Sequence, residues 1–154
     1  MKKQFRNLQL QQMDAQLAAW KGMSATTPPR PRVGWVRAIR ESLGMSAAAF
    51  ARRLGMTHAG VRKLESSEAT DAISLATLRK LAGALDCELH YQLVPRTSLT
   101  EQLHDQAEKV ARERLQPVVY SMALEDQAVS EKMGKYQLEQ EVKELLEGSR
   151  RDLW

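Results

Sequence analysis

The sequence predicts a mainly α-helical fold with one short β-strand. Apolar residues recur every three or four positions along most of the 154-residue chain, which is the spacing of helices with one buried side. Residues 44–65, GMSAAAFARRLGMTHAGVRKLE, have the pattern of two short capped helices that meet at a glycine. Residues 87–93 alternate apolar and polar side chains, as a strand with one buried face does.

Residues 1–32 are predicted to form an N-terminal helix followed by a proline-rich linker. Within residues 5–20, the side chains Leu10, Met13, Leu17 and Trp20 fall on one side of a helix. A seam this narrow is not stable alone, so it must pack on the protein's own core, on a second copy or on a partner. Residues 22–32, GMSATTPPRPR, contain three prolines and favour an extended path.

Residues 33–95 are predicted to form one small domain of helices with a trailing strand. Its first helix covers residues 33–43, and Arg37 and Arg40 are expected to face away from the core. Its last helix starts at the capping residue Ser74 and runs to about Leu85.

The middle of this domain is predicted to be a helix-turn-helix. Ser46 and Thr57 are suited to cap two short helices, because their hydroxyls can accept from free amides in the first turn. Gly55 ends the first helix in a left-handed conformation, which only glycine adopts without a Cβ penalty.

The outer side of the second short helix carries small and basic residues, which is typical of a helix that enters a DNA major groove. Arg62 can hold a guanine with two hydrogen bonds, Ala59 can touch a thymine methyl group, and His58 can contact a base or a phosphate. Hydroxyls at the helix starts suit phosphates, and the linker residues Arg30 and Arg32 add sequence-independent attraction. The candidate DNA-binding residues are Ser46, Arg53, Thr57, His58, Ala59, Arg62 and Lys63. The alternative interpretation is an ordinary corner between two helices with a solvated basic surface.

The strand at residues 87–93 is expected to turn Cys87, Leu89, Tyr91 and Leu93 towards the core, with Cys87 as a buried, inert thiol. Because a lone strand leaves its backbone groups unpaired, it must find a partner. That partner is either the same strand of a second copy or a short strand elsewhere in the chain. The first option would give a homodimer, which palindromic DNA sites require.

Residues 96–154 are predicted to form a helical extension that binds a protein partner. A capping box at residues 98–101 starts a helix that is expected to end at about Gln116, because Pro117 follows. Two further helices are expected at about residues 121–129 and 131–147.

Charge and composition narrow the classes of function. Residues 30–63 hold eight Lys and Arg against one acid, whereas residues 64–154 hold eleven against seventeen acids. This asymmetry predicts a polyanion as one partner and a protein as another. Scattered histidines, a single cysteine and the lack of a glycine-rich phosphate loop predict no enzyme, no cofactor and no metal. With no signal peptide and no membrane-spanning stretch, the protein is expected in the cytoplasm, on the nucleoid, and not at a membrane.

Several segments of residues 34–94 carry a family resemblance: LGMS, the pair Phe50-Ala51 with Leu54-Gly55, the pair Leu64-Glu65, and SLATLRKLAGALDCEL. On these segments the chain resembles the λ-repressor-like (XRE-type) helix-turn-helix family. One departure is Ala47, which stands where this family often has a glutamine used on DNA.

A second resemblance covers nearly the whole chain, through LQLQQMDAQLAAW, PPRPRVGWVRAIRESLGM, LDCELHYQLVPRTSLTEQL and MALEDQAV. On these segments the chain looks like the mobile mystery protein A family, whose members are similar to antitoxins encoded beside a Fic-domain protein. The resemblance implies a DNA-binding antitoxin that represses its own operon and neutralises a Fic-type, AMP-transferring toxin through its C-terminal helices.

Antitoxins that silence Fic proteins carry a Ser/Thr-x-x-x-Glu pattern on a helix, and Ser121 and Glu125 match it here. In that mechanism the glutamate pairs with an arginine that would otherwise hold the γ-phosphate of the nucleotide. Asp126 departs from the Gly or Asn that usually follows. The alternative function is a stand-alone dimeric transcriptional repressor whose extensions serve only dimerisation.

Overall fold

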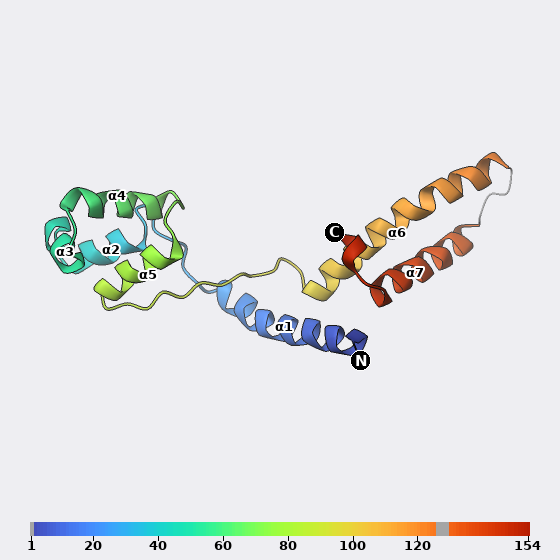
Figure 1. Cartoon of the computed structure of the whole chain (residues 1–154), viewed down its shortest axis with the longest axis horizontal. Coiled ribbons are helices and arrows are strands. Elements are labelled where there is room, and N and C mark those ends of the chain that lie inside the picture. Colours follow the sequence, from blue (N-terminus) through green and yellow to red (C-terminus); the bar gives the residue numbers. More distant parts are fainter. Residues whose placement is uncertain (1, 126–129) are drawn as a thin grey trace. The chain divides into compact units, whose positions relative to one another are not determined.

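The structure is a computed structural model that describes residues 2–125 and 130–154, and every regular element in these ranges is a helix (Figure 1). The chain divides into two compact units. Residues 26–92 form one unit, here called the inserted unit. The residues up to Ala25 and those from Leu93 onward form the other, here called the host unit. The inserted unit thus interrupts the host unit in the sequence.

The inserted unit contains four helices around one apolar core. They are α2 (Trp35–Ser42), α3 (Ala47–Leu54), α4 (His58–Ala69) and α5 (Leu75–Ala84). Each helix contributes to the buried cluster, because its apolar residues recur on one side. The buried residues of this core are Val36, Ala47, Phe50, Ala51, Val61, Leu81 and Leu85.

The helix-turn-helix formed by α3 and α4 confirms the prediction. The Ser46 hydroxyl accepts a hydrogen bond from the Ala49 amide at 3.1 Å, and the Thr57 hydroxyl accepts one from the Gly60 amide at 3.1 Å. Gly55 ends α3 with φ 66° and ψ 35°, a left-handed conformation that a Cβ atom would strain. These three local features fix where α4 begins relative to α3.

The predicted strand at residues 87–93 is wrong, because this segment is extended coil without ladder pairing. Tyr91 and Leu93, which were expected in the core, are 63% and 80% exposed, and Cys87 is also exposed. The physical reason is the missing partner: none of the described residues forms a second strand against which this one could pair. Alternation of side chains alone does not bury them.

The host unit is built on a pair of long helices, α6 (Leu99–Leu124) and α7 (Glu131–Glu147), which lie side by side (Figure 1). The helix α1 (Lys2–Ser24) packs on α6, and the short 3₁₀ helix η1 (Arg151–Leu153) closes the end of the core. The buried residues of this core are Ala107, Ala111, Val142, Leu145 and Leu153.

The start of α6 is capped twice. Ser98 and Glu101 form the predicted capping box. In addition, the carboxylate of Asp14 on α1 accepts hydrogen bonds from the amides of Leu99 at 2.6 Å and Thr100 at 3.0 Å. The hydroxyl of Thr100 is the main cause that lowers the pKa of Asp14, and the two amides add to it. This contact ties α1 to α6.

Several predicted helix limits in the host unit are wrong. The helix α6 does not end before Pro117 but continues through it to Leu124. Proline fixes φ near the helical value and removes one backbone donor, so a long packed helix can tolerate it at a cost. The segment up to Leu124 expected as a separate helix therefore belongs to α6, while residues 126–129, Asp126 included, lie outside the described residues. The helix α1 extends beyond the predicted residues 5–20 at both ends.

Candidate nucleic-acid interface

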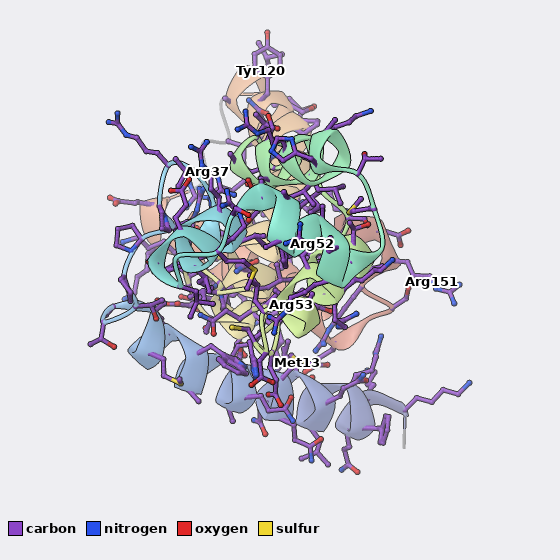
Figure 2. All side chains as sticks on the ribbon, turned by 90° about the vertical axis from the view of Figure 1, so that its left-hand side faces the viewer. Met13, Arg37, Arg52, Arg53, Tyr120 and Arg151 are labelled. Carbon is purple, nitrogen blue, oxygen red and sulfur yellow. The ribbon has the colours of Figure 1, made fainter. Side chains whose placement is uncertain are left out.

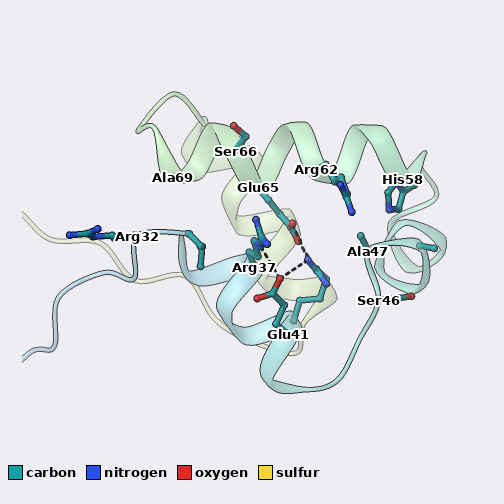
Figure 3. Close-up of a pocket in the computed structure, with 13 residues that line it drawn as sticks. Arg32, Arg37, Glu41, Ser46, Ala47, His58, Arg62, Glu65, Ser66 and Ala69 are labelled. Carbon is teal, nitrogen blue, oxygen red and sulfur yellow. Dashed lines mark hydrogen bonds and ion pairs between the residues drawn. The ribbon is translucent and has the colours of Figure 1, made fainter.

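A groove of about 570 Å³ lies on the inserted unit between α4, the start of α3 and α2. On the α4 side it is lined by His58, Arg62 and Ser66, which are four residues apart and therefore share one helix face. Figure 3 shows Arg62 and His58 pointing from α4 towards the start of α3, where Ser46 and Ala47 lie. The groove thus gathers exposed polar and basic side chains at the starts of both helices of the helix-turn-helix.

A buried ion pair forms the floor of this groove. Arg40 on α2 donates from Nε to one oxygen of Glu65 at 2.6 Å and from Nη2 to the other at 3.1 Å. It also donates from Nη1 to the carbonyl of Met45, just before α3, at 2.8 Å. The Glu65 carboxylate raises the pKa of Arg40 further above its ordinary value. The sequence-based expectation that Arg40 faces away from the core is therefore wrong: the pair joins α2, α3 and α4 from within.

A second carboxylate fixes the start of α2. Glu68 on α4 accepts from the amides of Trp35 at 2.8 Å and Val36 at 2.9 Å, and so replaces a conventional N-cap. Gly34 precedes them with φ 85°, and a Cβ at this position would lie 2.8 Å from a Glu68 oxygen. Only glycine fits here, because both the backbone conformation and the space exclude a side chain.

The linker arginines have different surroundings. Arg30 forms an ion pair with Asp71 and donates to the carbonyl of Glu68 at 3.0 Å. Its positive charge is therefore paired within the inserted unit. Arg32 lines the groove together with Arg37 of α2. Arg37 donates to Glu41 at 2.8 Å and lowers the pKa of that carboxyl group. Because the two acids of the groove each face an arginine, Arg62 and Arg32 leave the groove with a basic excess.

The groove brings together only part of the predicted DNA-binding set. Ser46, His58 and Arg62 line it. Thr57, Ala59 and Lys63 are exposed at or near the start of α4 but do not line the groove. Arg53 lies on the exposed side of α3 beside Arg52 (Figure 2) and donates to the carbonyl of Ala84 at 3.0 Å. These DNA-contact assignments stay predictions.

Sequence reasoning missed several groove residues, among them Ser66 and Arg37. Ser66 follows Arg62 by four positions, so the helical period could have identified it. Arg37 was recognised only as an outward-facing residue, and no local signal relates it to α4. Its place at the groove depends on the packing of α2 against α4, which the sequence does not show directly.

The end of the α6–α7 pair is the second candidate site. Ser121 lies in the last turn of α6 and Glu125 caps its end, and both side chains are exposed. Around them, Tyr120 and Leu124 are 68% and 72% exposed, and Figure 2 shows Tyr120 projecting away from its helix. Further exposed apolar side chains at this end are Val118, Val119, Met133 and Tyr136. From Leu115 to Leu124 the chain carries no charge, a composition typical of a protein-binding surface.

Comparison with known families agrees with the fold of the inserted unit. Residues 36–92 match the model of the helix-turn-helix family HTH_3, the XRE or λ-repressor-like type. No curated protein and no solved structure matches the chain. A domain of this family indicates a DNA-binding regulator, and the family is one of binding domains rather than enzymes.

Two kinds of feature are absent from residues 2–125 and 130–154. No helix in this part of the chain is sufficiently long and apolar to span a membrane. No three His, Cys, Asp or Glu side chains in the same ranges are arranged to hold a metal ion.

Proposed function

We propose that this protein is a homodimeric repressor of its own operon that also neutralises a Fic-type, AMP-transferring toxin. The observation that carries the first half is the groove on the helix-turn-helix, where Arg62 and His58 stand exposed at the start of α4. An arginine there can grip a guanine edge in a major groove, while Ser46 and Thr57 contact phosphates. Double-stranded operator DNA is therefore the proposed nucleic-acid partner, on the nucleoid in the cytoplasm.

Lys63, Ala59 and Arg53 complete the proposed DNA surface. Lys63 and Arg53 supply attraction to the phosphate backbone, which weakens as salt rises because bound counterions are released. Ala59 supplies an apolar contact to a thymine methyl group. The two kinds of contact differ in their response to salt and to base sequence, so they can be measured separately.

Gel-shift titrations with the protein's own promoter fragment test this proposal. Arg62→Ala should weaken binding by about 1–3 kcal/mol, or roughly 5- to 150-fold, and relax the preference at one base pair. The matched control is Arg79→Ala, an exposed arginine on α5 that does not line the groove. Equal affinities for wild type and Arg62→Ala, or a wild-type protein without salt-sensitive binding, would contradict the proposal.

The second half of the proposal assigns the end of the α6–α7 pair to the toxin. Ser121 and Glu125 are exposed among apolar side chains, so Glu125 is free to pair with an arginine of a partner's nucleotide site. The test is AMP transfer by the proposed toxin partner, a Fic-domain protein. Glu125→Ala should restore transfer, whereas Glu139→Ala, an exposed acid on α7, should not. Continued inhibition by Glu125→Ala would exclude this residue.

The alternative function is a dimeric repressor without a toxin partner. It is supported by α1, which exposes large apolar residues that a dimer could cover. Co-expression with the neighbouring reading frame, followed by pull-down, distinguishes the two. Co-purification at a fixed ratio supports the antitoxin, and a homodimer alone supports the simple repressor.

A further inference from the structure

The host unit contains a cavity of about 330 Å³, lined by α1, α6 and the end of α7. Four basic side chains line it: Lys3, Arg6, His104 and Arg150. Of these, His104 already interacts with Glu108 on its own helix. Half-buried leucines from all three helices form the apolar part of the wall: Leu10, Leu103 and Leu146. The cavity thus combines a basic cluster with an apolar surface.

Neutral oxygen atoms hold the two arginines of this cavity in place. Arg6 donates to the carbonyls of residues 148 and 149, each at 2.9 Å. Arg150 donates from Nε to the carbonyl of Leu146 at 2.9 Å and from Nη2 to the side-chain oxygen of Asn7 at 2.5 Å. Both guanidinium groups are therefore fixed in position, but no carboxylate offsets their charge at these contacts.

The acids around the cavity do not balance its positive charge. In the described part of the chain, none of Lys3, Arg6 and Arg150 forms an ion pair with a carboxylate. Glu147 is the one acid in the cavity wall. The carboxyl end of a helix such as α7 adds only about half a negative charge, so an excess of about one and a half positive charges remains.

The two arginines also destabilise one another. Burial lowers the pKa of Arg150, and the nearby charge of Arg6 lowers it further. The Nε atom of Arg6 is buried and finds no hydrogen-bond acceptor among residues 2–125 and 130–154, and an unpaired buried donor costs free energy. The backbone of Arg150 has φ 63°, a strained value for a residue with a Cβ. A negative charge placed in the cavity would offset the repulsion between the arginines.

We propose that this cavity binds a small organic phosphate, a phosphate monoester whose organic group is apolar. A phosphate monoester carries about 1.5 to 2 negative charges at neutral pH, which matches the positive excess better than the single charge of a carboxylate. The planar guanidinium groups of Arg6 and Arg150 suit its oxygen atoms. The three leucines provide a surface for the apolar group.

The size of the cavity favours a small molecule over a segment of a macromolecule. Its volume lies near the lower end of the range of ligand pockets, about 300–1,000 Å³. None of the residues proposed to contact DNA and neither Ser121 nor Glu125 lines it. The site is therefore independent of the proposed repressor and antitoxin functions, and its test needs neither an operator nor a toxin.

Calorimetric titration of the full chain with three probes tests the ligand class. Phenyl phosphate should saturate one site per chain at about pH 7.5, where it is doubly charged. Inorganic phosphate, which lacks the ring, should bind about tenfold more weakly. Benzoate, which has the ring but a single charge, should also bind about tenfold more weakly. No saturable binding of phenyl phosphate would overturn the proposal. Equal affinity for benzoate would refute the phosphate, and equal affinity for inorganic phosphate would refute the apolar group.

Two pairs of neighbouring residues provide matched variants. Arg150 lines the cavity and Arg151 does not, so Arg150→Gln should weaken phenyl phosphate binding at least about tenfold, whereas Arg151→Gln should leave it unchanged. Lys3 lines the cavity and Lys2 does not, and both are exposed. Lys3→Ala should weaken binding about three- to fivefold, and Lys2→Ala should not. Equal weakening within the lysine pair would show only general attraction to charge and overturn the proposal.

Thermal unfolding gives a second readout, because a ligand that binds only the folded state raises its melting temperature. A Trp35→Phe background leaves Trp20 and Trp154, which both belong to the host unit. Saturating phenyl phosphate should raise the melting temperature in this background but not after Lys3→Ala/Arg150→Gln is added. Circular dichroism checks that each variant is folded, and if Arg150→Gln is not, the lysine pair decides. An unchanged melting temperature in the Trp35→Phe background would contradict the proposal.

Discussion

Removal of Arg40 should destabilise the inserted unit more than any single exposed charge could. Its side chain is 9% exposed and that of Glu65 is 5% exposed, so neither charge has much water to replace its partner. In Arg40→Met the Glu65 carboxylate stays buried without its two hydrogen bonds, and the Met45 carbonyl loses its donor.

The magnitude follows from these contacts. Removing one partner of a buried ion pair costs about 3–5 kcal/mol, a large share of the roughly 5–15 kcal/mol by which a domain is stable. The double variant Arg40→Met/Glu65→Leu removes both charges of the pair and leaves neither one unpaired, so its loss should be only about 0–2 kcal/mol. The two positions should therefore show a favourable coupling of at least about 3 kcal/mol in a double-mutant cycle.

Urea unfolding followed by tryptophan fluorescence measures this coupling. Trp35 is the one tryptophan of the inserted unit, since Trp20 and Trp154 lie in the host unit. A Trp20→Phe/Trp154→Phe background therefore reports the inserted unit alone. The reasoning is refuted if Arg40→Met loses less than about 1 kcal/mol, or if the double variant loses the sum of both single variants.

Three further outcomes are expected. Gly34→Ala should lower the stability of the inserted unit by about 1–3 kcal/mol, because the positive φ of Gly34 and a carboxylate oxygen 2.8 Å from the Cβ position exclude a side chain. Gly83 on α5 has open space around its Cβ position, so Gly83→Ala should raise the stability by about 0.5–1 kcal/mol. The midpoints of urea unfolding compare the two variants. The Thr100 hydroxyl holds the folded-state pKa of Asp14 below its unfolded value. The ionised Asp14 therefore stabilises the host unit fully above about pH 4, and this stabilisation is lost as the pH falls through the folded-state pKa. In Asp14→Asn, the melting temperature of the host unit should not show this decline at acid pH. Cys87 is exposed and should react with a thiol reagent in the native protein as fast as after unfolding, and slow reaction would show that it is covered.

Features that depend on neighbours in the sequence could be predicted. Ser46, Thr57 and Gly55 each act on residues within four positions, so caps and turn could be read directly from the chain. The same holds for the capping box at the start of α6. These local signals were sufficient to define the helix-turn-helix and the beginning of most helices.

Features that depend on distant residues could not be predicted. The strand at residues 87–93 has the right alternation, but a strand needs a partner that the chain does not provide among its described residues. Arg40 and Glu65 are 25 positions apart, and nothing in the sequence near Arg40 reveals that it is buried. The groove residue Arg37 comes to line the same groove as Arg62 only when α2 packs on α4.

The cap that Asp14 places on α6 also has a consequence for synthesis on the ribosome. Its acceptor sites lie 85 positions later, at Leu99, while the whole inserted unit is made in between. Since domains fold as units while the chain emerges, the helix-turn-helix can finish folding before α6, on which α1 packs, has been synthesised. A nascent chain that stalls before α6 would carry a folded helix-turn-helix unit, preceded by an α1 that has no α6 to pack on. Such fragments should be prime targets for chaperones and proteases.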